Sequence, residues 1–343
     1  MSLSCGWDAA EDRNGIGAEW AYFTANGPDA HAVFYVLVEG GTLVPPIVAP
    51  LIRKTTHDDG VPITQNRLDV IEAHRTGRHM RTISWPRGRK YAATISFDFD
   101  AEEVWIGENP ANAQKPGVLS QGVYGARVGV PLILELLRKH EVLATFFVCG
   151  RDAERHPDAV RSIVEAGHEL AHHGYTHTNP TELSLEAERE ELERGLEALR
   201  SLGGQVTGYR SPSWETTPHT LGLLREYGFA YSSNRLDDLN PYELEGEDLI
   251  EVPVSWILDD APHFWFANDT WEKTIRSPRE VLDVWLPEID GIAALGGHVM
   301  ITAHPMLIGR PSRLAMLEDV ISHLINTGAW LCTAAEAAAA ARR

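Results

Sequence analysis

The sequence predicts an α/β fold: a distorted (β/α) barrel of about seven parallel strands behind an N-terminal extension. From Tyr91 onward, short apolar segments alternate with amphipathic helical segments over about 250 residues. This alternation is typical of repeated βα units and a parallel sheet. An open, doubly wound sheet is the alternative. It loses support because neither a G-x-G-x-x-G motif after the first strand nor a G-x-x-x-x-G-K-[ST] motif occurs.

The composition of the chain changes near residue 85. Residues 1–90 hold ten acidic and ten basic side chains, so the rest of the chain carries the whole formal charge of −19. Residues 1–84 show no lasting helical or strand periodicity. We therefore expect an N-terminal extension over residues 1–84 and a barrel over residues 85–343. The extension ends in a basic run, which we expect to lie against acidic surface of its own or a neighbouring subunit; an anion-binding arm is the alternative.

Charge and composition also limit the partners and the compartment. An acidic chain repels phosphate backbones, so a nucleic-acid partner is not expected. The most apolar stretch, residues 32–52, is broken by glycines and prolines and is predicted to be a short strand, a turn and a loop rather than a membrane span. Three scattered cysteines and the lack of a signal peptide indicate a cytoplasmic protein.

The elements of the barrel follow from local patterns. One helix is marked by Ser184 as N-cap, by Leu192, Leu196 and Leu199 on one face, and by a Gly-Gly pair at 203–204. The expected strands are residues 91–97, 143–149, 169–171, 206–209, 230–233, 250–254, 299–303 and 330–333. The other expected helices are residues 128–140, 157–166, 220–227, 278–295, 314–326 and 334–341.

Polar side chains follow the expected strands. Because the carboxyl ends of parallel barrel strands build the active site, these side chains are the candidate site. They are Asp98, Asp100, His173, His177, Arg210, Asp259, Asp260 and His304. Asp98 and Asp100 lie two residues apart on a strand, so both carboxylates can face one cavity, where one can bind a metal and the other act as a base. A pair that only caps a turn is the structural alternative.

The histidines predict a metal site. His173 and His177 have the spacing that binds one metal ion from a helix face or tight loop, whereas the adjacent His172 would point elsewhere. With one carboxylate they supply three protein ligands and leave an open position, which is typical of catalytic zinc. Histidines that serve packing alone are the alternative.

Other residues have candidate roles around this site. His304 follows an apolar strand and can act as a general acid, because imidazole ordinarily titrates near pH 6.5. Arg210 can hold the free carboxylate through a bidentate contact. A core histidine and an ordinary ion pair are the respective alternatives. The expected substrate-binding residues are Trp214, Trp256, Asp259 and Asp260.

From about residue 85 to residue 335 these motifs resemble the polysaccharide deacetylase family, carbohydrate esterase family 4. The family's Asp-Asp, His-x3-His, Arg-x-Pro and late-strand histidine motifs are similar to Asp98-Phe99-Asp100, His173 to His177, Arg210 to Pro212, and His304. This chain inserts one residue between the two carboxylates. The resemblance implies Asp98 as the base, His304 as the acid, and a divalent metal ion, expected to be Zn²⁺, on Asp100, His173 and His177.

Within the family, residues 97–102, 171–177, 256–260 and 303–305 resemble an intracellular branch. That branch includes a peptidoglycan deacetylase, cyclic imide hydrolases and a metal-independent allantoinase. The allantoinase-type members lack the second metal histidine, so the presence of His177 favours metal use. The resemblance implies a cytoplasmic homo-oligomer, with tetramers known among its members.

The substrate and the activity stay open at this point. The missing secretion signal favours a small cyclic imide or amide as the substrate. The alternative is an N-acetylated sugar in peptidoglycan, chitin or a related oligosaccharide. A barrel that binds a ligand without catalysis is the alternative from another class of protein. The intact spacing of the candidate ligands disfavours it.

Overall fold

The computed structural model describes residues 3–11, 17–25, 33–38, 83–266 and 275–342, with side chains described from residue 83 onward. The chain divides into two compact units, residues 1–67 and 68–343. The predicted division at residues 84/85 stays a prediction. Among the described helices, none has the length and apolar character needed to span a bilayer.

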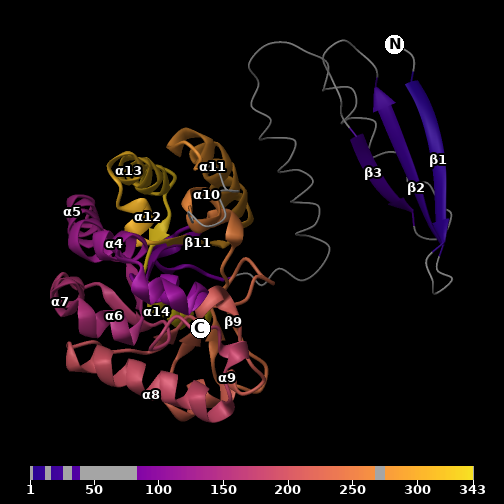
Figure 1. Ribbon diagram of the computed structural model, residues 1–343. Helices are drawn as coiled ribbons and strands as arrows, with labels where there is room; N and C mark the ends of the chain where they lie inside the picture. Colours follow the sequence, from indigo (N-terminus) through magenta and orange to yellow (C-terminus); the bar gives the residue numbers. More distant parts are fainter. Residues whose placement is uncertain (1–2, 12–16, 26–32, 39–82, 267–274, 343) are drawn as a thin grey trace. The chain divides into compact units, whose positions relative to one another are not determined.

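The first unit contains a three-stranded antiparallel sheet in the order β1-β2-β3 (Figure 1). The strands are β1 Leu3–Glu11, β2 Gly17–Ala25 and β3 Val33–Val38. No strand was predicted at β1 or β2, because their sequences mix alanine, glycine and acidic residues without regular alternation. The short strand predicted within residues 32–52 is confirmed by β3. The turn and loop predicted after it, and the basic residues before residue 83, lie outside the described residues.

The second unit is a curled, mostly parallel sheet surrounded by helices, which confirms the predicted fold class (Figure 1). Seven strands run parallel to their neighbours in the order β11-β4-β5-β6-β7-β8-β10. They are β4 Ala92–Phe99, β5 Thr145–Val148, β6 Glu169–His172, β7 Gly208–Tyr209, β8 Tyr231–Ser232, β10 Ile250–Glu251 and β11 His298–Ala303. Antiparallel β9 Tyr242–Glu243 extends β10, and β12 Trp330–Leu331 pairs with β4. A single parallel bridge, Asp259 with Thr302, spans the seam beside β11, so the barrel is distorted.

The helices confirm the predicted ones and add several short elements. Those predicted are α5 Val130–Lys139, α7 Pro157–Glu165, α8 Leu185–Ser201, α9 Thr220–Glu226, α11 Pro278–Leu295, α13 Pro311–Asn326 and α14 Ala334–Ala341. Those missed are α3 Glu103–Glu108, α4 Pro116–Tyr124, α6 Gly150–Arg155, α10 Ala261–Phe264 and α12 Pro305–Ile308. The missed helices have four to nine residues, too few to show an amphipathic period. Ser184 caps α8 as predicted, by accepting a hydrogen bond from the Ala187 backbone N–H.

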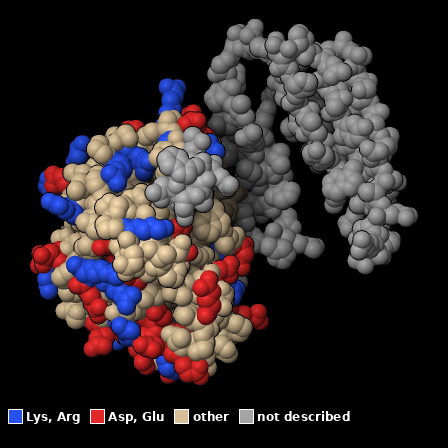
Figure 2. Space-filling view, in the orientation of Figure 1, with Lys and Arg blue, Asp and Glu red and all other residues tan. Residues whose placement is uncertain are grey.

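Strand alternation separates an outer core from the barrel interior. On β4, Ile95 and Phe97 pack in the outer core beneath the helices, so Ser96 and Asp98 face the other way. On the inner face, Phe147 and Met300 pack with Ala334 and other residues of the interior. The outer surface is acidic around α8, which has six glutamates among 17 residues, and Figure 2 shows acidic side chains gathered on the side where α8 lies in Figure 1.

Candidate active site

The predicted site residues converge at the carboxyl ends of the parallel strands. Eight of the ten line one pocket of about 530 Å³. They are Asp98, Asp100, His173, His177, Trp214, Trp256, Asp259 and His304. Arg210 and Asp260 do not line this pocket; both are fully buried and contact residues that do. The structure thus brings together side chains spread over about 200 residues of sequence.

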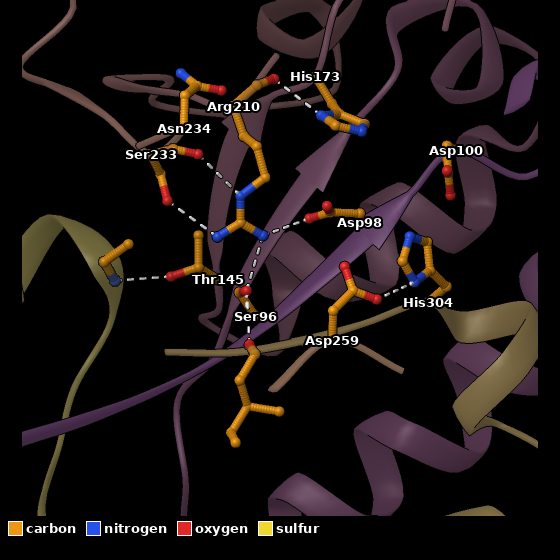
Figure 3. A network of polar contacts seen from close by, with 12 residues as sticks. Ser96, Asp98, Asp100, Thr145, His173, Arg210, Ser233, Asn234, Asp259 and His304 are labelled. Atoms are coloured by element: carbon orange, nitrogen blue, oxygen red, sulfur yellow. Dashed lines mark hydrogen bonds and ion pairs between the residues drawn. The ribbon is translucent and has the colours of Figure 1, made fainter. Parts of the chain in front are cut away.

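Arg210 lies beneath Asp98 at the end of β7. Its Nη1 donates hydrogen bonds to Asp98 Oδ1 at 2.6 Å and to Ser96 Oγ at 2.9 Å, and its Nη2 donates to Ser233 Oγ at 3.0 Å (Figure 3). The predicted bidentate contact is therefore wrong, because Ser96 and Ser233 take the other donors. The guanidinium also lies 3.9 Å from the centre of the Phe147 ring. These contacts hold the Arg210 guanidinium in place from several sides.

The pKa of Asp98 is lowered from its ordinary value. Burial alone would raise this pKa, but the positive charge of Arg210 and the neighbouring His173 and His304 outweigh it. A largely buried carboxylate that stays ionised and lines a pocket can accept a proton from a molecule bound in that pocket.

Asp100 presents an unpartnered carboxylate to the pocket. It is 1% exposed, and neither Oδ1 nor Oδ2 has a hydrogen-bond partner among the described residues. Burial raises the pKa of Asp100 to about 7. Buried polar atoms are seldom left without a partner, so this carboxylate is suited to bind a cation.

Two imidazoles complete the candidate metal group. His177 Nε2 lies 3.5 Å from Asp100 Oδ2, and ligand atoms of Asp100, His173 and His177 all lie within 4.8 Å of one another. His173 Nδ1 lies 2.9 Å from the Arg210 carbonyl oxygen, to which it can only donate, so the lone pair remains on Nε2. Burial lowers the pKa of His177 to about 3, which keeps it neutral, as a ligand must be. The residues therefore fit a divalent ion.

His304 has a carboxylate partner behind it. Its Nδ1 lies 2.6 Å from Asp260 Oδ1, and its backbone N–H donates to the same carboxylate. Burial would lower the pKa of His304, but Asp100, Asp260 and Asp259 together raise it well above its ordinary value. Asp259 lies farther away, 3.9 Å from Nδ1, and lines the pocket (Figure 3). Asp260, expected to bind substrate, is instead placed behind His304.

Two tryptophans form one wall of the pocket. Trp214 and Trp256 stack with ring centres 4.0 Å apart; Trp214 is buried, whereas Trp256 is 47% exposed. Ser213 and Trp214 both have a φ of 59°, in the left-handed region that non-glycine residues seldom adopt. This turn follows the end of β7, and the Trp214 ring lines the pocket.

The sequence prediction missed Ser96 and Ser233. Ser96 precedes Asp98 by two residues on the same strand face, so strand parity could have revealed it. Ser233 follows β8, and its contact with Arg210 depends on the pairing of β7 with β8.

A second acidic group lies beside α3 and differs from the candidate metal group. Ligand atoms of Glu102, Asp152 and His156 also lie within 4.8 Å of one another. Here, however, His156 Nε2 is already 2.7 Å from Glu102, and Asp152 accepts hydrogen bonds from Arg155 and the Glu103 backbone. Paired atoms of this kind support the start of α3 and do not indicate a missing ion.

Comparisons with known proteins agree with the geometry. A family model described as polysaccharide deacetylase matches residues 124–232. A peptidoglycan deacetylase of Helicobacter pylori is 30% identical over 257 residues, which cover 66% of this chain and 87% of that protein. A crystal structure of a Mycobacterium smegmatis protein assigned as a polysaccharide deacetylase has a TM-score of 0.75 and 39% identity, over 77% of this chain and 94% of that one. A Puue allantoinase structure, with a TM-score of 0.67 and 24% identity over 77% of this chain and 94% of that one, shares the fold.

Proposed function

The chain belongs to the polysaccharide deacetylase family, whose members hydrolyse carbon–nitrogen bonds other than peptide bonds, and we propose that it removes the acetyl group from an N-acetylated amino sugar. The observation that carries this proposal is the arrangement of Asp98 and His304 in one pocket with an unpartnered Asp100 and two neutral imidazoles. This is the set of groups that hydrolysis of an amide by an activated water requires.

Asp100, His173 and His177 would hold a divalent ion, with Zn²⁺ expected from two imidazoles and one carboxylate. Such an ion, when bound, supplies a Lewis acid that polarises the amide carbonyl and lowers the pKa of water.

The chain's own residues then move two protons. Asp98, kept ionised by Arg210, accepts a proton from the water whose oxygen attacks the carbonyl carbon. His304, kept protonated by Asp260, gives its proton to the nitrogen as the carbon–nitrogen bond breaks. The products are a free amine and acetic acid, which ionises to acetate by giving its proton to solvent. The proton on Asp98 returns through solvent to His304, which restores both groups.

The pocket wall supports a sugar as the substrate. The stacked Trp214 and Trp256 offer a flat apolar surface beside the acid and the base, on which a pyranose ring can rest. The sequence favoured a small cyclic imide. The similarities of 30% identity or more that span most of both chains, however, are to proteins named as deacetylases, whereas the allantoinase, at 24% identity, is similar in fold alone. A cytoplasmic location and a homo-oligomer stay predictions.

The test is a comparison of two substrate classes with Zn²⁺-loaded protein. N-acetylglucosamine oligomers and peptidoglycan fragments are assayed for released acetate, and succinimide, hydantoin and allantoin for ring opening. We expect acetate from the sugars and none from the Asp98→Asn variant. Ring opening without acetate release would contradict the sugar proposal in favour of the imide. Inertness toward both classes would favour a binding protein.

A further inference from the structure

The segment that carries both candidate metal-binding histidines is held from outside the pocket. Between His173 and His177 the chain makes a tight turn in which Gly174 has a φ of 77°. A Cβ atom at Gly174 would lie 2.6 Å from the Thr176 carbonyl oxygen, so the turn requires glycine. A turn of this kind exposes successive backbone N–H groups, which need acceptors when buried.

Glu191 of α8 supplies these acceptors. Its Oε2 accepts hydrogen bonds from the backbone N–H groups of Tyr175 at 2.9 Å and Thr176 at 2.7 Å. Its Oε1 accepts a third hydrogen bond, from Thr176 Oγ1, at 2.9 Å. One side chain thus binds the turn at three points, all between the two histidines.

The turn is also fixed on its other side, by the start of α6. The backbone N–H groups of Gly150 and Arg151 donate to the carbonyl oxygens of Gly174 at 3.0 Å and Tyr175 at 2.8 Å. These bonds restrain the carbonyl groups of the turn. Glu191 is the side chain that restrains its N–H groups at Tyr175 and Thr176.

We infer that Glu191 is a positioning residue of the metal site: its carboxylate sets the turn between His173 and His177, and thereby the distance between the two imidazoles. This inference rests on the proposed metal binding at Asp100, His173 and His177. Metal–nitrogen bonds tolerate only small errors in length, so a turn that loses three hydrogen bonds would hold the ion less tightly. Groups that orient metal ligands typically contribute roughly ten- to hundredfold in affinity.

The experiment measures Zn²⁺ affinity of metal-free protein by competition with a chelator. We expect Glu191→Ala to weaken Zn²⁺ binding by roughly ten- to hundredfold. We expect Glu191→Gln to recover most of the affinity, because its amide oxygen can accept both N–H groups and its NH₂ can donate to the Thr176 hydroxyl. The matched control is Glu197→Ala, which removes an exposed glutamate of the same helix and should leave affinity unchanged.

Two further readouts separate positioning from folding. Thermal unfolding of the metal-free variants reports stability, and the visible spectrum of Co²⁺-loaded protein reports ligand geometry, which we expect to change in Glu191→Ala. If that variant does not fold, Thr176→Val removes one of the three hydrogen bonds and should weaken Zn²⁺ binding less. Wild-type affinity and an unchanged Co²⁺ spectrum in a folded Glu191→Ala or Thr176→Val protein would overturn the inference. Wild-type protein that binds no Zn²⁺ would instead overturn the metal site itself.

Discussion

The Arg210 guanidinium lies 2.6 Å from the Asp98 carboxylate, and both side chains are buried. An ion pair removed from water is stable only while both partners are present. The same contact keeps Asp98 ionised, so stability and the proposed catalysis depend on one pair of residues.

Asp98→Asn should abolish most turnover and leave metal binding intact. Asparagine has nearly the shape of aspartate but cannot accept the proton of the attacking water. General bases contribute about 10²- to 10⁴-fold, so we expect a loss of kcat in that range. The measurement is kcat together with bound Zn²⁺ per chain. Retained activity would contradict the role of Asp98 as the base.

Arg210→Met should destabilise the fold strongly. It leaves the Asp98 carboxylate buried without its counter-charge, which typically costs about 3–5 kcal/mol. Urea unfolding of the metal-free protein measures this cost. The penalty comes from the Asp98 charge, which stays buried without a partner. The double variant with Asp98→Asn should therefore recover part of the lost stability. Equal stability of single and double variants would show that packing, not charge, is what Arg210 supplies.

Asp260→Asn should shift the alkaline limb of the pH–rate profile to lower pH. The carboxylates around His304 raise its pKa, and Asp260 provides the direct contact at 2.6 Å. His304 must be protonated to act as the acid, so activity is lost as pH rises through its pKa. Removal of the Asp260 charge lowers that pKa, and the loss begins earlier. The acidic limb, which we assign to Asp98, should stay in place; an unmoved alkaline limb would argue against this pairing.

The barrel could be predicted because its evidence is spread along the chain. Each βα unit repeats a short apolar strand and an amphipathic helix, and polar residues recur just after the strands. Asp98, His173 and His304 belong to different units yet meet in one pocket, as the strand-end argument requires.

Contacts that depend on packing between distant elements were beyond sequence reasoning. Glu191 is one of six glutamates on α8. Only the packing of α8 against the turn between His173 and His177 distinguishes it from the exposed Glu197. The sequence indicates the same role for Asp259 and Asp260 because the two residues are adjacent. The bridge of Asp259 with Thr302 instead directs Asp259 to the pocket and Asp260 to His304.

Removal of the metal should stop turnover without unfolding the barrel, because most of the core lies away from the site. Dialysis against a chelator should abolish activity while far-ultraviolet circular dichroism is retained, and Zn²⁺ should restore activity. At a Zn²⁺ concentration 100 times Kd, binding should stabilise the fold by about 2.7 kcal/mol. Undiminished turnover by demonstrably metal-free protein would contradict metal dependence.

Gly195→Ala should destabilise the barrel through the third histidine, His172. That histidine accepts a hydrogen bond on Nδ1 from the Gly174 N–H at 3.0 Å, so its Nε2–H donates to the Leu192 carbonyl at 3.2 Å. A Cβ at Gly195 would lie 2.2 Å from Nε2 of this fixed ring. Overpacking of this kind typically costs about 1–3 kcal/mol.

Gly222→Ala is the matched control, because Gly222 lies in α9 and has no atom within 4 Å of the added Cβ. Alanine is the better helix former by up to about 1 kcal/mol, so this variant should be as stable as the wild type or more stable. Urea unfolding of both variants therefore compares the same substitution with and without a clash. If Gly195→Ala is also stabilised, the His172 ring can move away from the added Cβ at little cost in stability. The turn that carries His173 would then not depend on the His172 contact.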